Sequence, residues 1–371
     1  METSVISAST VEQRCYCWHM TCSVNHAAAA MQAARAGLPY GVVMATGGAS
    51  QLASAGGVPL LTAPLLWLAV AQALWIALAS LLRTQLRPMH EFSIAWTLGP
   101  AQQHAGTLTV PLGLAVIASG LGEACGSLMA SPITAAGLVL AWSATVVYGG
   151  RFVAALCSRP LALRAVDGAW FLAPAVLLGD GIATINALPS PGTVQGQALL
   201  ALATMATCAG LLIYWLVVVV ASLRVARHGL ADAPRAPWWI AMGCAGLAAA
   251  AIAHVLQAPD PPWLEMLRIP LQMAMVATFL AALVLLLPII AYSLQFLLRT
   301  CRFTNRAVWP PTFSTAVLAM GALGTGQTLQ LDSITTLGTI AAWATLMLWA
   351  ITGCWNLHLD LRCRLHPDAG A

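Results

Sequence analysis

Ten long apolar segments follow one another along the chain, and its basic residues fall on alternate sides of them. The segments are 39–57, 60–82, 105–122, 132–157, 168–188, 196–223, 237–257, 268–298, 308–328 and 333–357. All sixteen basic residues are arginines, and all except Arg268 lie before the first segment or at the end of an even-numbered one. About 20 apolar residues are enough for a helix to cross a hydrocarbon core. We therefore predict an all-α integral membrane protein with ten transmembrane helices.

The one-sided placement of arginine predicts how the chain is oriented. Because basic loops stay on the cytoplasmic side, both termini are expected to be cytoplasmic in a multi-pass protein of the plasma membrane. We expect a disordered N-terminal tail over 1–35, a transmembrane transport domain over 36–360 and a short C-terminal tail over 361–371.

Composition excludes several classes of protein. With 60% hydrophobic and 8% charged residues, the chain lies far from soluble domains, in which about a quarter of residues are charged. The net charge of +4 reflects the cytoplasmic arginines, so it does not indicate nucleic-acid binding. We find no HExxH motif, no paired intramembrane aspartates and no Ser/His dyad at recognisable spacing, so an enzyme is not expected.

Glycine divides the segments into two kinds. The odd-numbered segments contain 17 glycines, whereas the longer even-numbered ones contain 7. Small residues allow helices to approach closely, and uniformly apolar helices suit lipid. The odd segments are therefore predicted to be inner helices and the even ones outer helices, as five hairpins around a central pore. An ordinary ten-helix bundle with glycine at tight contacts is the alternative. Pro111 and Pro174 are expected to interrupt inner helices, and Pro310 and Pro311 to bend the start of the ninth segment.

Four short motifs open odd-numbered segments. They are Pro39-Tyr-Gly-Val-Val-Met-Ala-Thr-Gly47, Trp170-Phe-Leu-Ala-Pro174, Pro237-Trp-Trp-Ile-Ala-Met-Gly243 and Trp309-Pro-Pro-Thr-Phe313. In this order they resemble the tellurite-resistance/dicarboxylate transporter family of the voltage-dependent anion channel superfamily. Its relatives include malic-acid transporters, sulfite exporters and plant slow anion channels. The resemblance covers about residues 36 to 360.

The resemblance implies a homotrimer of five-hairpin barrels, each with an anion pore occluded by a phenylalanine. That role carries over to Phe313, because Trp309, Thr312 and Phe313 match the family pattern. Ser314 replaces the proline that follows in the family, which affects the expected kink. Tyr40 stands where relatives commonly have phenylalanine.

Asp180 is the acidic residue that lies well inside an apolar segment, between Gly179 and Gly181. A charge at that depth costs about 2.5–3.5 kcal/mol even on translocon scales. The carboxyl group is therefore expected to face the lumen or to be protonated, which makes it a candidate for proton coupling. The alternative is a residue that makes hydrogen bonds between helices.

Hydroxyl groups on the inner helices are the other candidates for the substrate path, since they can donate to an anion. They belong to Thr46, Thr107, Thr109, Thr184, Thr312 and Thr315. His104 and His254 are weaker candidates, and single histidines of this kind are commonly structural. A group of cysteine and histidine residues at 15–26 has no recognisable metal-binding spacing, so we expect no metal and no cofactor.

The predicted function is transport of a small anion, either a C4-dicarboxylate such as malate or an inorganic oxyanion, through a pore gated by Phe313. The partners are the anionic substrate and the lipid bilayer. Two alternatives are a ten-helix drug or metabolite exporter made of two five-helix halves, and an intramembrane enzyme. The two-helix period argues against the first.

Overall fold

The computed structural model describes residues 40–85, 101–127, 131–158, 163–189, 193–229, 238–258, 261–300 and 309–365. Five helices are called inner here: α2 (Tyr40–Ala55), α6 (Thr109–Cys125), α8 (Leu172–Asn186), α10 (Trp238–Gln257) and α12 (Trp309–Leu329). Five are called outer: α3 (Pro59–Gln85), α7 (Pro132–Ser158), α9 (Val194–His228), α11 (Pro262–Thr300) and α13 (Asp332–Leu365). Three short elements complete the set: α5 (Ala101–Thr107), η1 (Leu163–Ala165) and η2 (Gly168–Phe171). The described residues form no strand.

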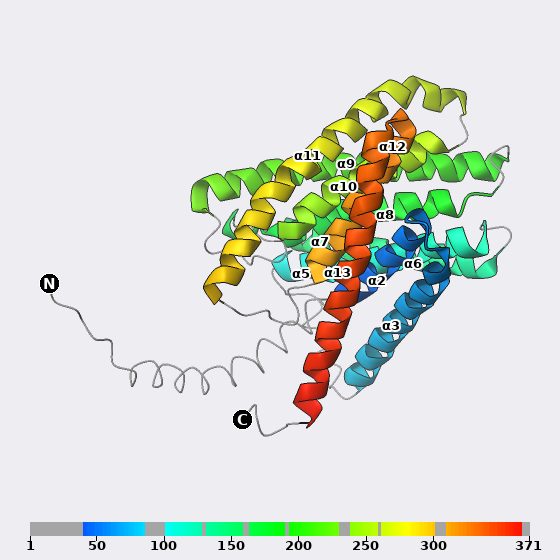
Figure 1. Ribbon diagram of the computed structural model, residues 1–371. Helices are drawn as coiled ribbons and strands as arrows, with labels where there is room; N and C mark the ends of the chain where they lie inside the picture. The colour runs from blue at the N-terminus through cyan, green and yellow to red at the C-terminus, as the bar shows by residue number, and fades with distance from the viewer. Residues whose placement is uncertain are drawn as a thin grey trace, which may run out of the picture.

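Each inner helix packs against the outer helix that follows it, so the chain forms five hairpins (Figure 1). The inner helices also pack against one another in the cyclic order α2, α6, α8, α10, α12 and back to α2. The predicted five hairpins around a common axis are therefore present. The two-halves alternative does not describe this arrangement, because the ring closes between the first and the last hairpin.

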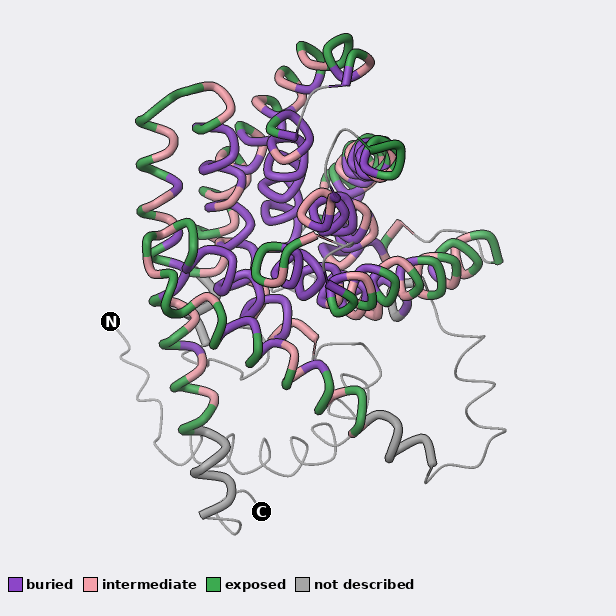
Figure 2. The backbone as a smooth tube through the Cα atoms, turned by 90° about the vertical axis from the view of Figure 1, so that its right-hand side faces the viewer, coloured by how far each residue is buried: buried purple, intermediate pink, exposed green. Residues whose placement is uncertain are grey.

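Burial separates the two sets of helices. Figure 2 shows buried residues concentrated on the central helices and exposed residues on the surrounding ones. In the most apolar stretch of α10, 89% of the residues are buried, compared with 17% for α13. The exposed residues of the outer helices include large apolar side chains such as Leu60, Trp75 and Met347. Such a surface suits lipid, which solvates apolar side chains as well as a protein core does.

Eight of the helices in the described residues are long and apolar enough to cross a membrane. The inner helices α2 and α12 are not among these eight. The 16 residues of α2 span about 24 Å at 1.5 Å per residue, and α12 is rich in glycine, serine and threonine. Both helices lie in the ring behind outer helices, so neither needs a continuous apolar surface.

Two inner segments begin with a break at a proline. The third segment is split into α5 and α6 at Leu108, three residues before Pro111. The fifth changes from the 3₁₀ turn η2 to α8 two residues before Pro174. Proline lacks the N–H that would bond to the carbonyl four residues earlier, and its ring crowds that carbonyl. The predicted interruptions are therefore present, in the first turns of α6 and α8.

Glycines bring α10 and α12 into backbone contact. A Cβ atom added at Gly321 would lie 2.5 Å from the carbonyl oxygen of Gly246, and one added at Gly246 would lie 2.8 Å from Cα of Leu318. A Cβ atom added at Gly243 would lie 2.7 Å from Oγ of Ser314. This part of the ring has no room for side chains between the two helices.

We expect Gly321→Ala to destabilise the protein by about 1–3 kcal/mol, because the added methyl group must push two backbones apart. The measurement is the thermal unfolding midpoint in a fixed detergent. Gly353→Ala in α13 is the matched control, since a Cβ atom there meets no atom within 4 Å. The control is expected to be neutral or stabilising by about 0.5–1 kcal/mol. Equal midpoints for the two variants would mean that the close α10–α12 contact does not limit stability.

The predicted N-terminal tail and its group of cysteine and histidine residues lie outside the described residues. At the other end α13 continues as a helix to Leu365, past the predicted helix end at 357. The residues that the structure describes contain no group of three or more potential metal ligands. Their cysteines at positions 125, 157, 208, 244 and 354 are free.

Candidate functional site: a closed cavity on the axis

A small cavity lies where the five inner helices meet, and every inner helix contributes to its lining. The lining residues are Gly48, Gln51, Leu112, Ala115, Val116, Ser119, Gly179, Ile182, Leu247, Phe313, Val317 and Met320. The centre of a water molecule can occupy about 20 Å³ of it, and a single water needs about 10–15 Å³ on this measure. The cavity thus has room for about one water and is too small for an organic anion.

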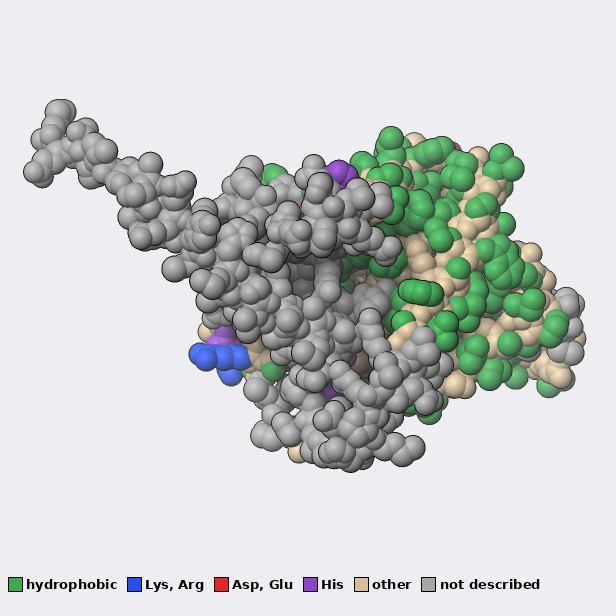
Figure 3. All heavy atoms as spheres, turned by 90° about the horizontal axis from the view of Figure 1, so that it is seen from below, with side chains coloured by type: hydrophobic (Ala, Val, Ile, Leu, Met, Phe, Trp, Pro, Cys, Tyr) green, Lys and Arg blue, Asp and Glu red, His purple; other side chains and the backbone are tan. Residues whose placement is uncertain are grey.

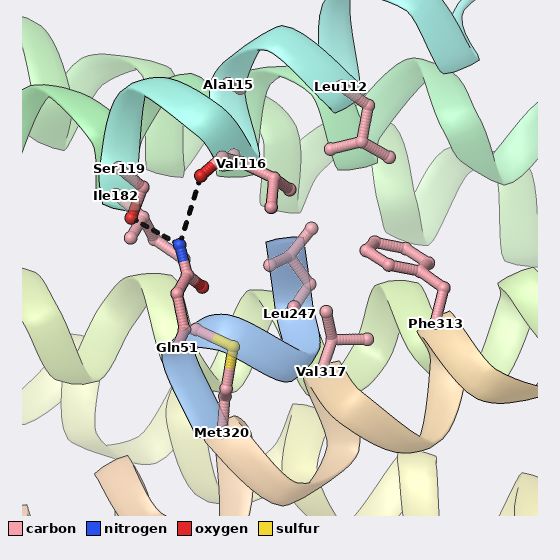
Figure 4. Close-up of a pocket in the computed structure, with 12 residues that line it drawn as sticks. Gln51, Leu112, Ala115, Val116, Ser119, Ile182, Leu247, Phe313, Val317 and Met320 are labelled. Carbon is pink, nitrogen blue, oxygen red and sulfur yellow. Dashed lines mark hydrogen bonds between the residues drawn. The ribbon is translucent and has the colours of Figure 1, made fainter. Parts of the chain in front are cut away.

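Phe313 borders the cavity from α12. Its ring projects into the space between Leu112 of α6, Leu247 of α10 and Val317 of α12 (Figure 4). The ring is 2% exposed and Leu112 is fully buried. Apolar side chains that meet on an axis block it sterically and keep it dry. This end of the cavity therefore has the geometry of a hydrophobic constriction.

Ser314, which replaces the proline of the family pattern, is buried against Gly243 of α10. Its hydroxyl oxygen has no hydrogen-bond partner among the described residues. The small side chain allows α10 to approach α12 next to Phe313. The helix α12 runs without interruption from Trp309 through Ser314 to Leu329, so Phe313 is held by close packing on α10 rather than by a proline that follows it.

The other end of the cavity is polar. The side-chain amide of Gln51 donates to Oγ of Ser119 at 2.8 Å and to the carbonyl of Val116 at 3.3 Å (Figure 4). Asn186 of α8 donates to the same Ser119 oxygen at 2.9 Å and to the exposed carboxylate of Glu123 at 2.8 Å. These side chains form a neutral chain of hydrogen bonds that leads from the cavity to Glu123 near the C-terminal end of α6.

Asp180 is fully buried but does not line the cavity. Its Oδ2 accepts a hydrogen bond of 2.6 Å from Thr145 of the outer helix α7, and its Oδ1 has no partner among the described residues. Successive residues of a helix point about 100° apart. Gly179 therefore lines the cavity while Asp180 faces α7 and Gly181 packs against Thr207 of α9.

The predicted path hydroxyls are bonded within the helical scaffold. Thr46 accepts from the indole of Trp349 in α13, and Thr184 accepts from Trp142 in α7. The hydroxyls of Thr107, Thr109 and Thr315 donate to carbonyls three or four residues earlier in the chain. Thr312 is fully buried, Tyr40 packs on α6 at Gly113, and His254 bonds to the carbonyl of Ala250.

Phe313 is thus the one predicted site residue among the described residues that line the cavity. Gln51 and Ser119 were missed by the sequence reasoning. One signal was available for Gln51, since it is the single side-chain amide in the segment 39–57. A polar side chain inside a membrane segment commonly faces the protein interior or a water-filled path.

A ring of parallel, glycine-rich helices around a constricted axis, covered by apolar outer helices, defines a membrane transport protein. The chain belongs to the voltage-dependent anion channel family, whose family model matches residues 39–356. The predicted superfamily is therefore confirmed. A comparison with curated proteins finds no match.

Membership in this family establishes the general activity. The protein is a multi-pass membrane protein that transports anions, and it is not an enzyme. Both parts of that statement agree with the predictions from sequence.

Proposed function

We propose that the protein carries a small anion, a C4-dicarboxylate such as malate or an inorganic oxyanion, along the axis of the five inner helices. Phe313 is the gate of this path, and the structure represents its closed state. The observation that carries the proposal is the cavity itself, because it draws its lining from all five inner helices and has the Phe313 ring at one end.

The chemistry of the lining suits a weakly held anion. No charged side chain is among the described residues that line the cavity, so no buried cation would trap the substrate. The amide of Gln51 is a donor that now bonds to Oγ of Ser119 and to the carbonyl of Val116, and the Ser119 hydroxyl can act as a second donor. When the constriction widens, these donors can turn to the anion and replace part of its hydration shell. Favourable entry together with easy exit is what conduction requires.

We also propose that Asp180 couples anion transport to the movement of protons. An ionised carboxylate that receives one hydrogen bond in a fully buried site is costly, so the neutral form is favoured in this closed state. Asp180 is adjacent in sequence to Gly179, which lines the cavity. A modest rotation of α8 would bring the carboxyl group towards the axis, where it could release its proton.

Orientation and assembly follow from the arginine pattern and from the family resemblance. We propose a homotrimer in the plasma membrane, with both termini on the cytoplasmic side. The exposed apolar side chains of the outer helices are available to lipid and to neighbouring subunits.

The direct test is transport by the purified protein in liposomes. We expect protein-dependent uptake of at least one radiolabelled anion from a panel of malate, succinate, sulfite, nitrate and chloride. Uptake should differ with and without an imposed pH gradient. Protein-free liposomes and liposomes containing heat-denatured protein are the controls. Uptake of uncharged or cationic compounds in the absence of any anion uptake would contradict the proposal.

A further inference from the structure

A second and larger cavity lies away from the axis, at the C-terminal end of the outer helix α9. Its volume is about 500 Å³, and the described residues that line it are Arg164, Arg224, Arg227 and His228. This volume is within the range of about 300–1,000 Å³ that is common for small-molecule sites. Figure 3 shows arginine and histidine side chains gathered at one edge of the molecule.

The positions of the basic residues along α9 explain why they meet. Two of them follow Arg224 on the same helix, Arg227 after three residues and His228 after four. At these spacings the side chains lie on one side of the helix. Arg164 reaches the same place from η1, and its Nε donates to Nδ1 of His228 at 3.4 Å. Three positive charges are therefore held together by two separate elements of the fold.

Arg224 is an unusual member of this group because it is 3% exposed. Its Nη1 donates to the carbonyl of Gly229 at 2.6 Å, and its guanidinium carbon lies 5.9 Å from the ring centroid of Trp238. Its Nε is buried and has no acceptor among the described residues. No carboxylate of the described residues forms an ion pair with it, whereas Arg268 at the opposite end pairs with Glu265. Burial makes a cation costly unless a negative charge lies close to it, so an anion bound here would stabilise the protein.

The surface beside the cavity indicates the source of that anion. Leu216, Val219 and Leu223 are 63%, 56% and 49% exposed. With Arg227 they are spaced by three, four and four residues, which forms one stripe along α9. An acyl chain can lie on the apolar part of the stripe while its headgroup reaches the arginines at the end. Basic pockets at the ends of transmembrane helices suit lipid phosphates in this way.

We propose that the cavity formed by Arg164, Arg224, Arg227 and His228 binds the phosphate group of an anionic phospholipid whose acyl chain lies along α9. Arginine is well suited to this role because its planar guanidinium can donate two parallel hydrogen bonds to one phosphate. The site is separate from the path on the axis, and the inference does not depend on which anion is transported.

The test is lipid binding to the full-length purified protein in detergent, followed by native mass spectrometry and by the thermal unfolding midpoint. The probe is dioctanoyl phosphatidylglycerol, and dioctanoyl phosphatidylcholine provides the same chains with a neutral headgroup. We expect the anionic lipid to bind more tightly and to raise the midpoint. Equal binding of the two lipids would overturn the proposal.

The variant Arg164→Gln/Arg227→Gln removes the two exposed arginines and leaves the buried Arg224 in place. Because each of these guanidinium groups would donate charge-assisted hydrogen bonds to the phosphate, we expect binding at least about tenfold weaker than in the wild type. Arg268→Gln removes one charge at the opposite end and should bind as the wild type does. If the double variant does not fold, the single variants Arg164→Gln and Arg227→Gln provide the same comparison.

Inorganic phosphate distinguishes a lipid site from a site for a soluble ion. We expect phosphate at the same concentration to produce no comparable rise in the unfolding midpoint, since it lacks the acyl chain. A rise from phosphate as large as that from the lipid would overturn the assignment to a lipid. Unchanged lipid affinity in the double variant would place lipid binding elsewhere on the protein.

Discussion

Replacing Phe313 by alanine is expected to raise anion flux by roughly tenfold or more, which corresponds to a barrier about 1.4 kcal/mol lower. The ring closes one end of a cavity that holds about one water, and its removal joins that space to the axis on the other side. Because water can fill the new space, the loss of stability should fall below the 3–5 kcal/mol typical of a truncated core phenylalanine. Phe313→Leu should give an intermediate flux, since an aliphatic side chain still keeps part of the axis dry.

The matched control is Phe152→Ala in the outer helix α7. Phe152 is 6% exposed and packs edge-to-face on Trp170, with ring centroids 5.4 Å apart, but it is not part of the cavity lining. Its truncation should lower the unfolding midpoint and leave flux unchanged. Liposome efflux and the midpoint in one detergent are measured for all four proteins. A Phe313→Ala protein that is as destabilised as Phe152→Ala and shows no gain in flux would end the gating proposal.

Replacing Asp180 by asparagine is expected to abolish the dependence of uptake on an imposed pH gradient. Asparagine has the shape of the protonated carboxyl group and can still accept the hydrogen bond that Thr145 now donates to Oδ2. The protein should therefore fold, and it should behave at every pH as a form that cannot release its proton. The measurement is uptake into liposomes at a series of inside and outside pH values.

Thr145→Val is the control for this second experiment. It removes the hydroxyl group that contacts Asp180 and keeps the titratable carboxyl group, so the response to a pH gradient should persist. An unchanged response in a well-folded Asp180→Asn protein would instead give Asp180 a purely structural role between α8 and α7. A response lost in both variants would point to the contact between the helices rather than to the proton.

Two features of the sequence were sufficient to predict the architecture of five helical hairpins with inner and outer helices. Arginines at every second boundary define pairs of helices, and the excess of glycine in the first member of each pair separates inner from outer helices. Both are properties of whole segments, so an error of a few residues in the boundaries does not alter them. The same reasoning treated α2 and α12 like the other segments, although they are not among the eight helices that are individually long and apolar enough to cross a membrane. Their place inside the ring removes that requirement.

Which residues line the cavity was decided by the tertiary structure, with Phe313 as the exception. Phe313 was found because it stands in a motif, whereas Asp180 and the threonines were selected for being polar on inner helices. An inner helix is surrounded by protein. Its side chains face the axis, one of two inner neighbours or an outer helix, and the faces of the helix that meet these neighbours are all rich in small residues. Hydrophobic periodicity distinguishes protein from lipid or water, and it carries no information on which neighbour a buried face meets. Near Asp180 a step of 100° along α8 separates the axis from α7, and only the packing of the five hairpins determines which residue faces which.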